Sequence, residues 1–173
     1  MNKFAVISPT HIPGKKKESW ERFREGGYIA FVSKLNQDLK NKSVDEIIGL
    51  INKIDPPQTH QKVHQRQKNY SGFFALDIGD YVAVNNTNDG LFGIGIIKSG
   101  YYYKERAHNT GSTDPKDFYS HFRDVDWVVT DYMKRKDILE ANETGWPPYG
   151  IITLMPELPG YIRRILKDRG IKV

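Results

Sequence analysis

The chain has 173 residues, of which 38% are hydrophobic and 27% charged, and its net charge is +5. This length and composition are typical of one soluble domain with its own core. The sequence has no cysteine, which excludes a disulfide scaffold and thiolate metal sites, and its apolar runs are too short to span a bilayer. No signal-peptide pattern opens it, so we expect a cytoplasmic protein whose modest positive charge permits nucleic-acid binding without indicating it.

The first third of the sequence predicts two buried strands and two helices. The short apolar runs "KFAVI" and "YIAFV" are typical of buried strands. Between them, "KKKESWERFREGG" predicts a helix that places Trp20 and Phe23 on one face and ends at Gly26-Gly27. "SVDEIIGLINKID" has the capping-box pattern Ser43-x-x-Glu46 and predicts a second helix.

The middle of the sequence predicts a β-hairpin. Two β-type runs, "IGDYVAV" and "GLFGIGII", flank a polar turn that ends in Asp89-Gly90. We expect the tyrosine triplet to extend the second run, with Tyr101 and Tyr103 on one side of the strand. The polar stretch 104–122 has no clear periodicity, and loops of this length in compact domains are often functional.

The last third predicts two strands and two helices. "DVDWVVT" predicts a strand with Asp124 and Asp126 toward solvent, opposite Val125 and Trp127. "DYMKRKDILEA" predicts a short helix, "YGIITL" a late strand and "PELPGYIRRILKDRG" a basic amphipathic helix. The whole chain therefore predicts a single α+β domain, residues 1–173, with a mixed, curved sheet rather than a doubly wound parallel one.

Known catalytic and nucleotide-binding motifs are not present. Gly93-x-Gly95 follows a turn and precedes more β-type residues, which excludes a dinucleotide fingerprint and indicates a bulge or a close backbone approach. His60 and His64 have metalloprotease spacing, but Gln61 replaces the catalytic glutamate. The sequence has no P-loop and no Gly-x-Ser-x-Gly. We expect no catalytic residue, no metal and no cofactor.

The basic blocks and aromatic residues of the sequence indicate nucleic acid as a candidate ligand. Aromatic side chains interleaved with Lys and Arg supply the π-faces and the positive charge that an unstacked base and its phosphates require. Any one basic block is more often a solvated face, and any one aromatic residue is more often part of the core. The candidates for contacts with a phosphate backbone are Lys15, Lys16, Lys17, Arg66, Lys68 and Arg106.

Four segments, in order, resemble an EVE domain of the PUA-like superfamily, in the long form found at the N-terminus of McrB-type restriction proteins. These segments are "FAVIS", "SWERFREGGYIAF", "GDYVAVNNTNDGLFGIGIIKSGYYY" and "HFRDVDWV", the last with an Arg-x-Val-x-Trp element at Arg123, Val125 and Trp127. The group is similar in fold to YTH domains. The resemblance spans nearly the whole chain and implies a curved mixed sheet or small barrel flanked by helices.

The resemblance implies a reader of modified bases rather than an enzyme. Domains of this kind take a flipped nucleotide into an aromatic-lined pocket. In McrB-type proteins the domain selects methylated double-stranded DNA, while an AAA+ GTPase motor domain in the same chain and a separate nuclease subunit cut it. This chain is then expected to be the recognition domain, with residues 156–170 leading toward the motor. N6-methyladenine and 5-methylcytosine both suit such a pocket.

The resemblance also implies where the pocket lies. It is bordered by the end of the first strand, the first helix, the second strand and the segment between 101 and 121. Family members often have Gly-Trp where this chain has Val32-Ser33, and Phe118 and Tyr119 are alternatives for the facing aromatic wall. The pocket candidates are Ser8, Pro9, Trp20, Phe31, Ser33, Tyr101, Tyr103, Phe118 and Tyr119.

Two other functions remain open from the sequence. One is an RNA-binding version of the same fold that reads a modified nucleotide, since no residue pattern identifies a 2′-hydroxyl contact. The other is a small hydrolase or nuclease that uses histidine and carboxylate side chains from residues 104–121. Metal-dependent cleavage favours the enzyme, and equal affinity for methylated and unmethylated DNA contradicts the reader.

Overall fold

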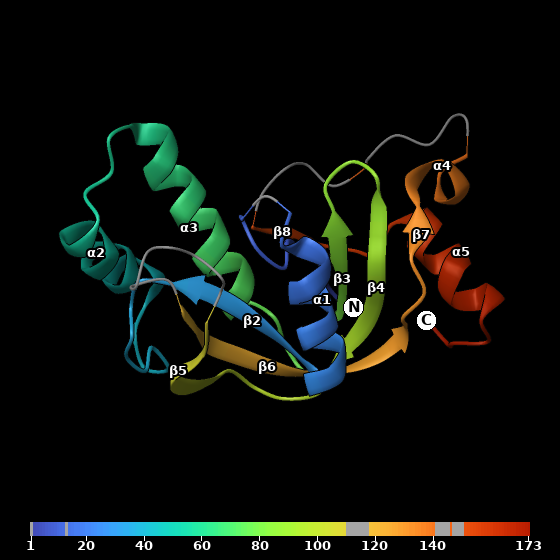
Figure 1. Ribbon diagram of the computed structural model, residues 1–173, viewed down its shortest axis with the longest axis horizontal. Coiled ribbons are helices and arrows are strands. Elements are labelled where there is room, and N and C mark those ends of the chain that lie inside the picture. Colours follow the sequence, from blue (N-terminus) through green and yellow to red (C-terminus); the bar gives the residue numbers. More distant parts are fainter. Residues whose placement is uncertain (1, 13, 110–117, 141–145, 147–150) are drawn as a thin grey trace.

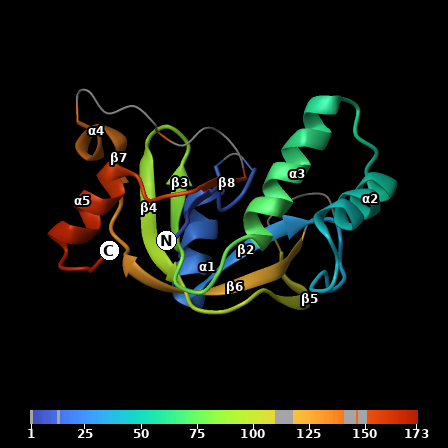
Figure 2. The same cartoon turned by 180° about the vertical axis from the view of Figure 1, so that it is seen from behind.

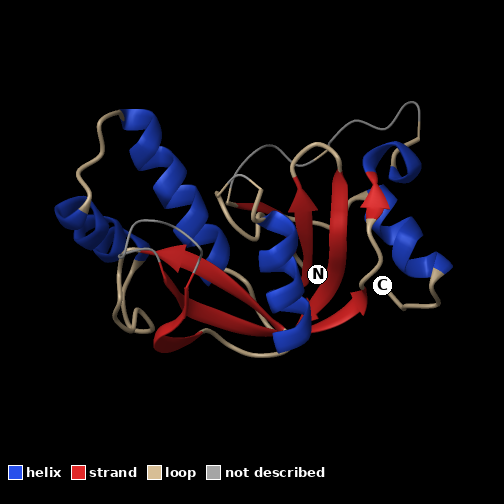
Figure 3. Ribbon diagram, viewed as in Figure 1, coloured by secondary structure: helices blue, strands red, loops and turns tan. Residues whose placement is uncertain are grey.

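The computed structural model describes residues 2–12, 14–109, 118–140, 146 and 151–173. Within these residues, strands and helices alternate irregularly along the chain (Figure 3). The strands are β1 (Phe4–Ile7), β2 (Tyr28–Ser33), β3 (Tyr81–Asn86), β4 (Gly90–Ile97), β5 (Tyr102–Asn109), β6 (Phe118–Val129), β7 (Met133–Lys134) and β8 (Ile152–Met155). The helices are α1 (Lys16–Gly26), α2 (Val44–Ile54), α3 (His60–Phe74), α4 (Arg135–Ile138) and α5 (Gly160–Asp168).

The described strands form one curled sheet, a half-barrel with helices around it (Figure 1). Its order is β2-β6-β4-β3-β1-β8, with β5 on β6 and β7 on β4. Strands β1 and β3 are parallel and the other pairs are antiparallel. The predicted α+β class with a mixed, curved sheet is therefore confirmed.

Both faces of the sheet are covered at β1 and β4, so these strands are apolar along their whole length. In β1, Ala5 and Ile7 point into one core, and Phe4 and Val6 into a second core on the opposite face. The first core lies beneath α1, α2 and α3, and the second lies beneath α4 and α5. Figures 1 and 2 place α2 and α3 at one end of the molecule, α4 and α5 at the other, and α1 between them. None of the described helices is long and apolar enough to cross a membrane.

Several predicted local elements are confirmed. Helix α2 begins with the predicted capping box, in which the Ser43 hydroxyl accepts the Glu46 N–H and the Glu46 carboxylate accepts the Ser43 N–H. Gly27 ends α1 in a left-handed conformation, with φ of 65°. The predicted hairpin is β3 and β4. Asp124 and Asp126 are exposed on β6, as expected.

Other elements differ from the prediction. Residues 102–109 do not extend β4 but form β5, which pairs with β6. The described residues of the polar stretch expected to be a loop, 104–109 and 118–122, are therefore strand, because they pair through backbone hydrogen bonds that do not depend on apolar side chains. The basic block 60–69 lies in helix α3, with His60 and His64 exposed. The helix predicted in "DYMKRKDILEA" is shorter than expected, because β7 comes first.

The Gly-x-Gly of β4 permits close packing of aromatic rings on the strand. A Cβ atom on Gly93 would lie 2.4 Å from the Trp20 ring, and one on Gly95 would lie 2.3 Å from the Val125 side chain. The β4–β6 register also shifts at Gly95. These glycines therefore make the close backbone approach that the sequence predicted, and the sheet bends where they occur.

The Arg-x-Val-x-Trp element donates hydrogen bonds to carbonyls at the C-terminal ends of two helices. Arg123 is buried and donates from Nε to the Phe73 carbonyl and from Nη2 to the Phe74 carbonyl, both at 3.1 Å, at the end of α3. Trp127 Nε1 donates to the Phe23 carbonyl in the last turn of α1 at 3.0 Å. Helix C-termini have unpaired carbonyls and partial negative charge, so both contacts stabilise the helices on the sheet.

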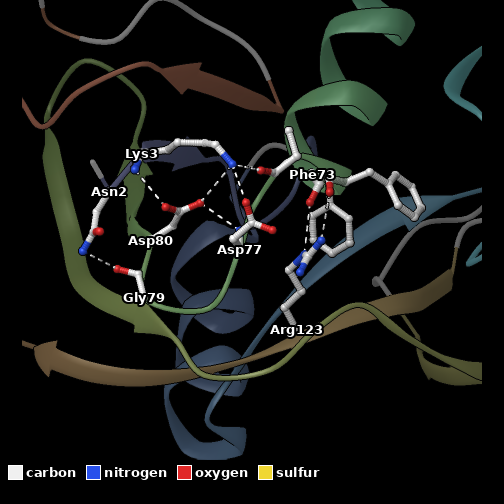
Figure 4. Close-up of polar contacts among 9 residues, drawn as sticks. Asn2, Lys3, Phe73, Asp77, Gly79, Asp80 and Arg123 are labelled. Atoms are coloured by element: carbon white, nitrogen blue, oxygen red, sulfur yellow. Dashed lines mark hydrogen bonds and ion pairs between the residues drawn. The ribbon is translucent and has the colours of Figure 1, made fainter.

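The Gly-Asp pair before β3 fixes the loop that leads into the sheet (Figure 4). The buried carboxylate of Asp80 accepts the backbone N–H groups of Lys3 and Asp77, both at 2.8 Å. Lys3 Nζ in turn contacts Asp77 at 2.6 Å. The loop thereby ties the start of β1 to the start of β3, and Gly79 adopts a φ of +93° that favours glycine.

Candidate functional site

A cleft of about 700 Å³ opens between α1, the β3–β4 hairpin and the segment after β6. Its volume is in the range of small-ligand sites, about 300–1,000 Å³. Helix α1 supplies one wall, because it lies across the curled sheet with Trp20 packed on Gly93. The lining residues are Gly14, Lys16, Lys17, Trp20, Glu21, Arg24, Asn86, Thr87, Phe92, Thr130 and Tyr132.

Three aromatic rings form the floor of the cleft. The Trp20 and Phe92 rings are stacked with centroids 6.2 Å apart, and the centroids of the Phe92 and Tyr132 rings are 5.7 Å apart. Trp20 and Phe92 are buried, whereas Tyr132 is 43% exposed. The inner rings are therefore fixed by the core, and the Tyr132 ring is accessible to a planar ligand.

The rim of the cleft carries more positive than negative charge. Lys16, Lys17 and Arg24 line it together with one carboxylate, Glu21. Partial burial lowers the pKa of Lys16, and the nearby carboxylate of Asp89 acts in the opposite direction. An anionic ligand at this rim would replace part of the hydration that Lys16 loses.

The cleft combines π-faces, cations and hydrogen-bonding groups. Asn86 donates from Nδ2 to the Tyr132 hydroxyl at 3.4 Å, and Thr130 supplies an exposed hydroxyl. Such a set suits a planar, hydrogen-bonding ring attached to a phosphate. Among the described residues, no group of three or more His, Asp or Glu side chains is placed to hold a metal ion.

The structure distributes the predicted pocket residues over several places, and of these Trp20 lines the cleft. Ser8, Pro9 and Tyr119 come together at the end of β1, where the buried Tyr119 hydroxyl donates to the Pro9 carbonyl and Ser8 Oγ donates to the Thr10 carbonyl at 2.9 Å. Both of these hydroxyls therefore already donate hydrogen bonds to backbone carbonyls. The side chain of Phe118 and residues 110–117 lie outside the described part of the chain.

Phe31 and Ser33 belong to the contact between β2 and α3. The buried Phe31 ring packs on Tyr70 and Phe73, with centroids 4.8 and 5.5 Å away. Ser33 Oγ and the Tyr70 hydroxyl share a hydrogen bond of 2.7 Å, and burial raises the pKa of Tyr70 to about 12. Both residues thus hold a helix on the sheet.

Tyr101 and Tyr103 surround His121 on β6. The Tyr101 hydroxyl accepts the Leu39 N–H at 3.1 Å and lies 2.9 Å from His121 Nδ1. His121 Nε2 lies 2.9 Å from the Leu35 carbonyl, which can only accept, so Nε2 carries the proton and Nδ1 accepts from Tyr101. Burial lowers the pKa of His121 to about 4. Burial is also the largest of the causes that raise the pKa of Tyr101 to about 12.

This arrangement weakens the hydrolase alternative. His121 is fully buried, and both of its ring nitrogens have partners. A general base needs a free nitrogen within reach of a substrate proton. The other histidine of that stretch, His108, has a side chain that lies outside the described part of the structure.

The residues predicted to contact a phosphate backbone also lie in several different places. Lys16 and Lys17 line the cleft, and Lys15 pairs with Glu18 at 3.0 Å beside it. Arg66 joins α3 to the end of α2 by contacts with Asp55 and Asn52, and its side chain is 16% exposed.

The remaining two phosphate candidates are exposed elsewhere. Lys68 lines a hollow between α3 and β8. Arg106 has a left-handed φ of 42°, and its N–H bonds to Asn36.

Of the eleven lining residues, sequence reasoning identified Lys16, Lys17 and Trp20 and missed the other eight, including the aromatic residues Phe92 and Tyr132. Tyr132 precedes Lys134-Arg135-Lys136, which is the same pattern of an aromatic beside basic residues that singled out the tyrosine triplet. That pattern could have identified Tyr132. Phe92 lies in an apolar strand and has no comparable signal.

Residues 7–145 match the family described as Domain of unknown function (DUF8426). The chain belongs to this family. The match includes α1, the β3–β4 hairpin and Tyr132, so the whole cleft lies inside the family domain. No curated protein matches the sequence.

Proposed function

We propose that this DUF8426 protein binds DNA that carries a methylated base and holds the flipped base in the cleft. The observation that carries the proposal is the three-ring floor beneath a rim of Lys16, Lys17 and Arg24. A base that stacks on an aromatic side chain gains about 1–3 kcal/mol, which offsets the few kcal/mol that flipping costs. The cations attract the phosphates on either side of the base.

The proposal relocates the base pocket relative to the sequence expectation. Trp20 and the lysines before it stay in the site, and Tyr132 becomes the stacking residue. The resemblance to EVE domains supports the same class of function and suggests a fold of the PUA-like type, for which the curled half-barrel is a compatible architecture. We extend the proposal to a role as the recognition domain of a modification-dependent restriction system, with a GTPase motor and a nuclease as partners.

Discrimination of the methyl group requires polar contacts in addition to apolar packing. One buried methyl contributes about 0.8 kcal/mol, which corresponds to roughly fourfold in affinity. Asn86, Thr87 and Thr130 line the cleft and can hydrogen-bond to a base edge. We expect these residues, rather than the rings, to determine which base is accepted.

The direct test is binding to matched duplexes by fluorescence anisotropy. Duplexes that carry one N6-methyladenine, one 5-methylcytosine or neither are compared at one salt concentration, together with RNA of the same sequence. We expect tighter binding to one methylated DNA, and Tyr132→Ala should lower that affinity about 10–100-fold. Tyr102→Ala is the matched control, because Tyr102 lies on β5 and bonds to Asp124. Equal affinity for all DNA duplexes excludes recognition of a methylated base, and preference for the RNA favours the RNA-binding alternative.

The rim is tested through salt dependence. Changing Lys16 and Lys17 together to Gln should flatten the plot of log affinity against log salt by roughly one unit per lysine, for methylated and unmethylated DNA alike. Lys40→Gln with Lys42→Gln, two exposed lysines in the segment before α2, is the control and should leave the slope unchanged. An unchanged slope in the Lys16 and Lys17 variant places the phosphates elsewhere.

A further inference from the structure

A second hollow adjoins the cleft on the other side of Tyr132. We call it the flanking groove; its volume is about 540 Å³, and its lining residues are Asn88, Asp89, Tyr132, Lys134, Arg135, Lys136 and Leu139. Tyr132, whose side chain is half-exposed, lines both the cleft and the flanking groove, so the two cavities are neighbours. Both cavities fall within the volume range of small-ligand sites.

The backbone around the flanking groove is fixed by the sheet. Strand β7 pairs with β4, with Leu91 opposite Met133 and Gly90 opposite Lys134. A Cβ atom on Gly90 would lie 2.1 Å from the Met133 carbonyl oxygen, so glycine is required for this approach. The Arg135 N–H bonds to the Asp89 carbonyl at 2.8 Å and joins α4 to the hairpin. Backbone contacts within the fold therefore fix the shape of the groove.

The flanking groove carries an excess of positive charge. Three cations, Lys134, Arg135 and Lys136, line it together with the carboxylate of Asp89. Arg135 lies over the Trp146 ring at 5.3 Å. Lys134 and Lys136 are exposed, and among the described residues neither forms an ion pair. Two lysines are thus available to an anion beside an accessible aromatic ring.

We propose that the flanking groove is a second nucleotide subsite. It holds the nucleotide next to the flipped base on the same strand, with the phosphate between them at Lys134 and Lys136 and the Tyr132 ring between the two bases. This inference rests on the function proposed above. It adds that the smallest full ligand is a dinucleotide unit with its bridging phosphate, because neighbouring π-faces and cations along one path are what a single strand requires.

The test measures how affinity grows with ligand length. The ligands are the 5′-monophosphates of N6-methyldeoxyadenosine and 5-methyldeoxycytidine, and trinucleotides with each base in the centre, titrated by calorimetry at low salt. For wild-type protein we expect the trinucleotide of the accepted base to bind at least about 10-fold tighter than its monophosphate. The double variant Lys134→Gln and Lys136→Gln should lose most of this gain and keep the monophosphate affinity. Lys134→Arg with Lys136→Arg should restore the gain, and Lys40→Gln with Lys42→Gln should leave it unaffected.

Each outcome separates the two proposals. If wild-type protein binds neither the monophosphates nor the trinucleotides, the proposed function fails and the subsite falls with it. If the ligands bind but length brings no gain, or the gain survives in the Lys134 and Lys136 glutamine variant, the subsite alone is wrong. A hexaglutamate peptide that competes as well as the trinucleotide would assign the groove to acidic peptides and overturn the subsite.

Discussion

The aromatic floor of the cleft and the three tyrosines Tyr101, Tyr103 and Tyr119 lie around the same curled sheet but have different surroundings. The hydroxyls of Tyr101, Tyr103 and Tyr119 all bond to backbone or side-chain groups of the chain itself. In the cleft, the Tyr132 ring is 43% exposed and has cations on both sides. The first group makes its bonds within the fold, and the second leaves an aromatic ring exposed beside cations.

This difference shows which observation distinguishes a binding surface from a core. Aromatic residues beside basic ones occur in both regions of the sequence. A buried or half-buried hydroxyl with an internal partner indicates a structural role, because a buried polar group that gives up its partner for a ligand loses about 1–3 kcal/mol. The Tyr132 hydroxyl also accepts a bond, from Asn86 at 3.4 Å, but that bond is exposed. An exposed ring next to lysines that pair with no carboxylate in the described part of the chain loses nothing comparable. Four substitutions test this contrast through the free energy of unfolding.

Trp20→Ala should have the largest effect, although Trp20 lines the cleft. Its ring is 4% exposed, packs on Gly93 and contacts Trp127 edge-on at 4.7 Å. Removing a buried tryptophan costs about 3–5 kcal/mol. Urea denaturation measures this loss, and Trp20→Phe should lose less than half as much. A loss below about 1 kcal/mol would show that the cleft floor is independent of the core.

His121 should make stability depend on pH. Its pKa is about 4 in the folded protein and about 6.5 in the unfolded chain, so between these values the unfolded state binds the proton that the folded state excludes. The contribution is complete above pH 6.5 and is lost as the pH falls to 4, at a total cost of about 3 kcal/mol. Urea titrations from pH 7 to 4 measure it.

The control variants isolate the histidine responsible. His121→Gln should flatten the curve, whereas His64→Gln, at an exposed position on α3, should leave it unchanged. A curve of the same steepness in His121→Gln would mean that other groups cause the pH dependence.

Tyr101→Phe should have an intermediate effect. The change removes the hydroxyl that bridges the Leu39 N–H and His121 Nδ1, so two partners lose a hydrogen bond, at a cost of about 1–2 kcal/mol. Tyr102→Phe is the control and should stay within about 0.5 kcal/mol, because its bond to Asp124 is exposed. DNA affinity should be the same in both variants; a drop in Tyr101→Phe alone would return Tyr101 to the ligand site.

Tyr132→Ala should have the smallest effect on stability, less than about 1 kcal/mol, because nearly half of the side chain is already exposed. Its large effect is expected on binding. Thermal unfolding and DNA titration of the same protein preparation measure both quantities. A large loss of stability together with unchanged binding would reverse the contrast between the two regions.

Sequence reasoning succeeded where the determining contacts are local. The capping box of α2 joins residues three positions apart, and the β3–β4 hairpin follows from a short turn between two β-type runs. It also recognised that the glycines of β4 needed a close backbone approach. Its prediction that the tyrosine triplet extends β4 is wrong, because Tyr101 precedes β5, although Tyr101 and Tyr103 do contact the same residue, His121.

The sequence by itself therefore determined the α+β class, most elements and the excess of positive charge, because periodicity, caps and turns act over a few residues. Only the tertiary structure decided which aromatic rings stay accessible. Trp20, Phe92 and Tyr132 come from three distant segments, and their meeting depends on how α1 lies across the bent strand β4. Exposure of a ring depends on the segments that cover it, and long-range packing on the curled sheet determines which segments those are.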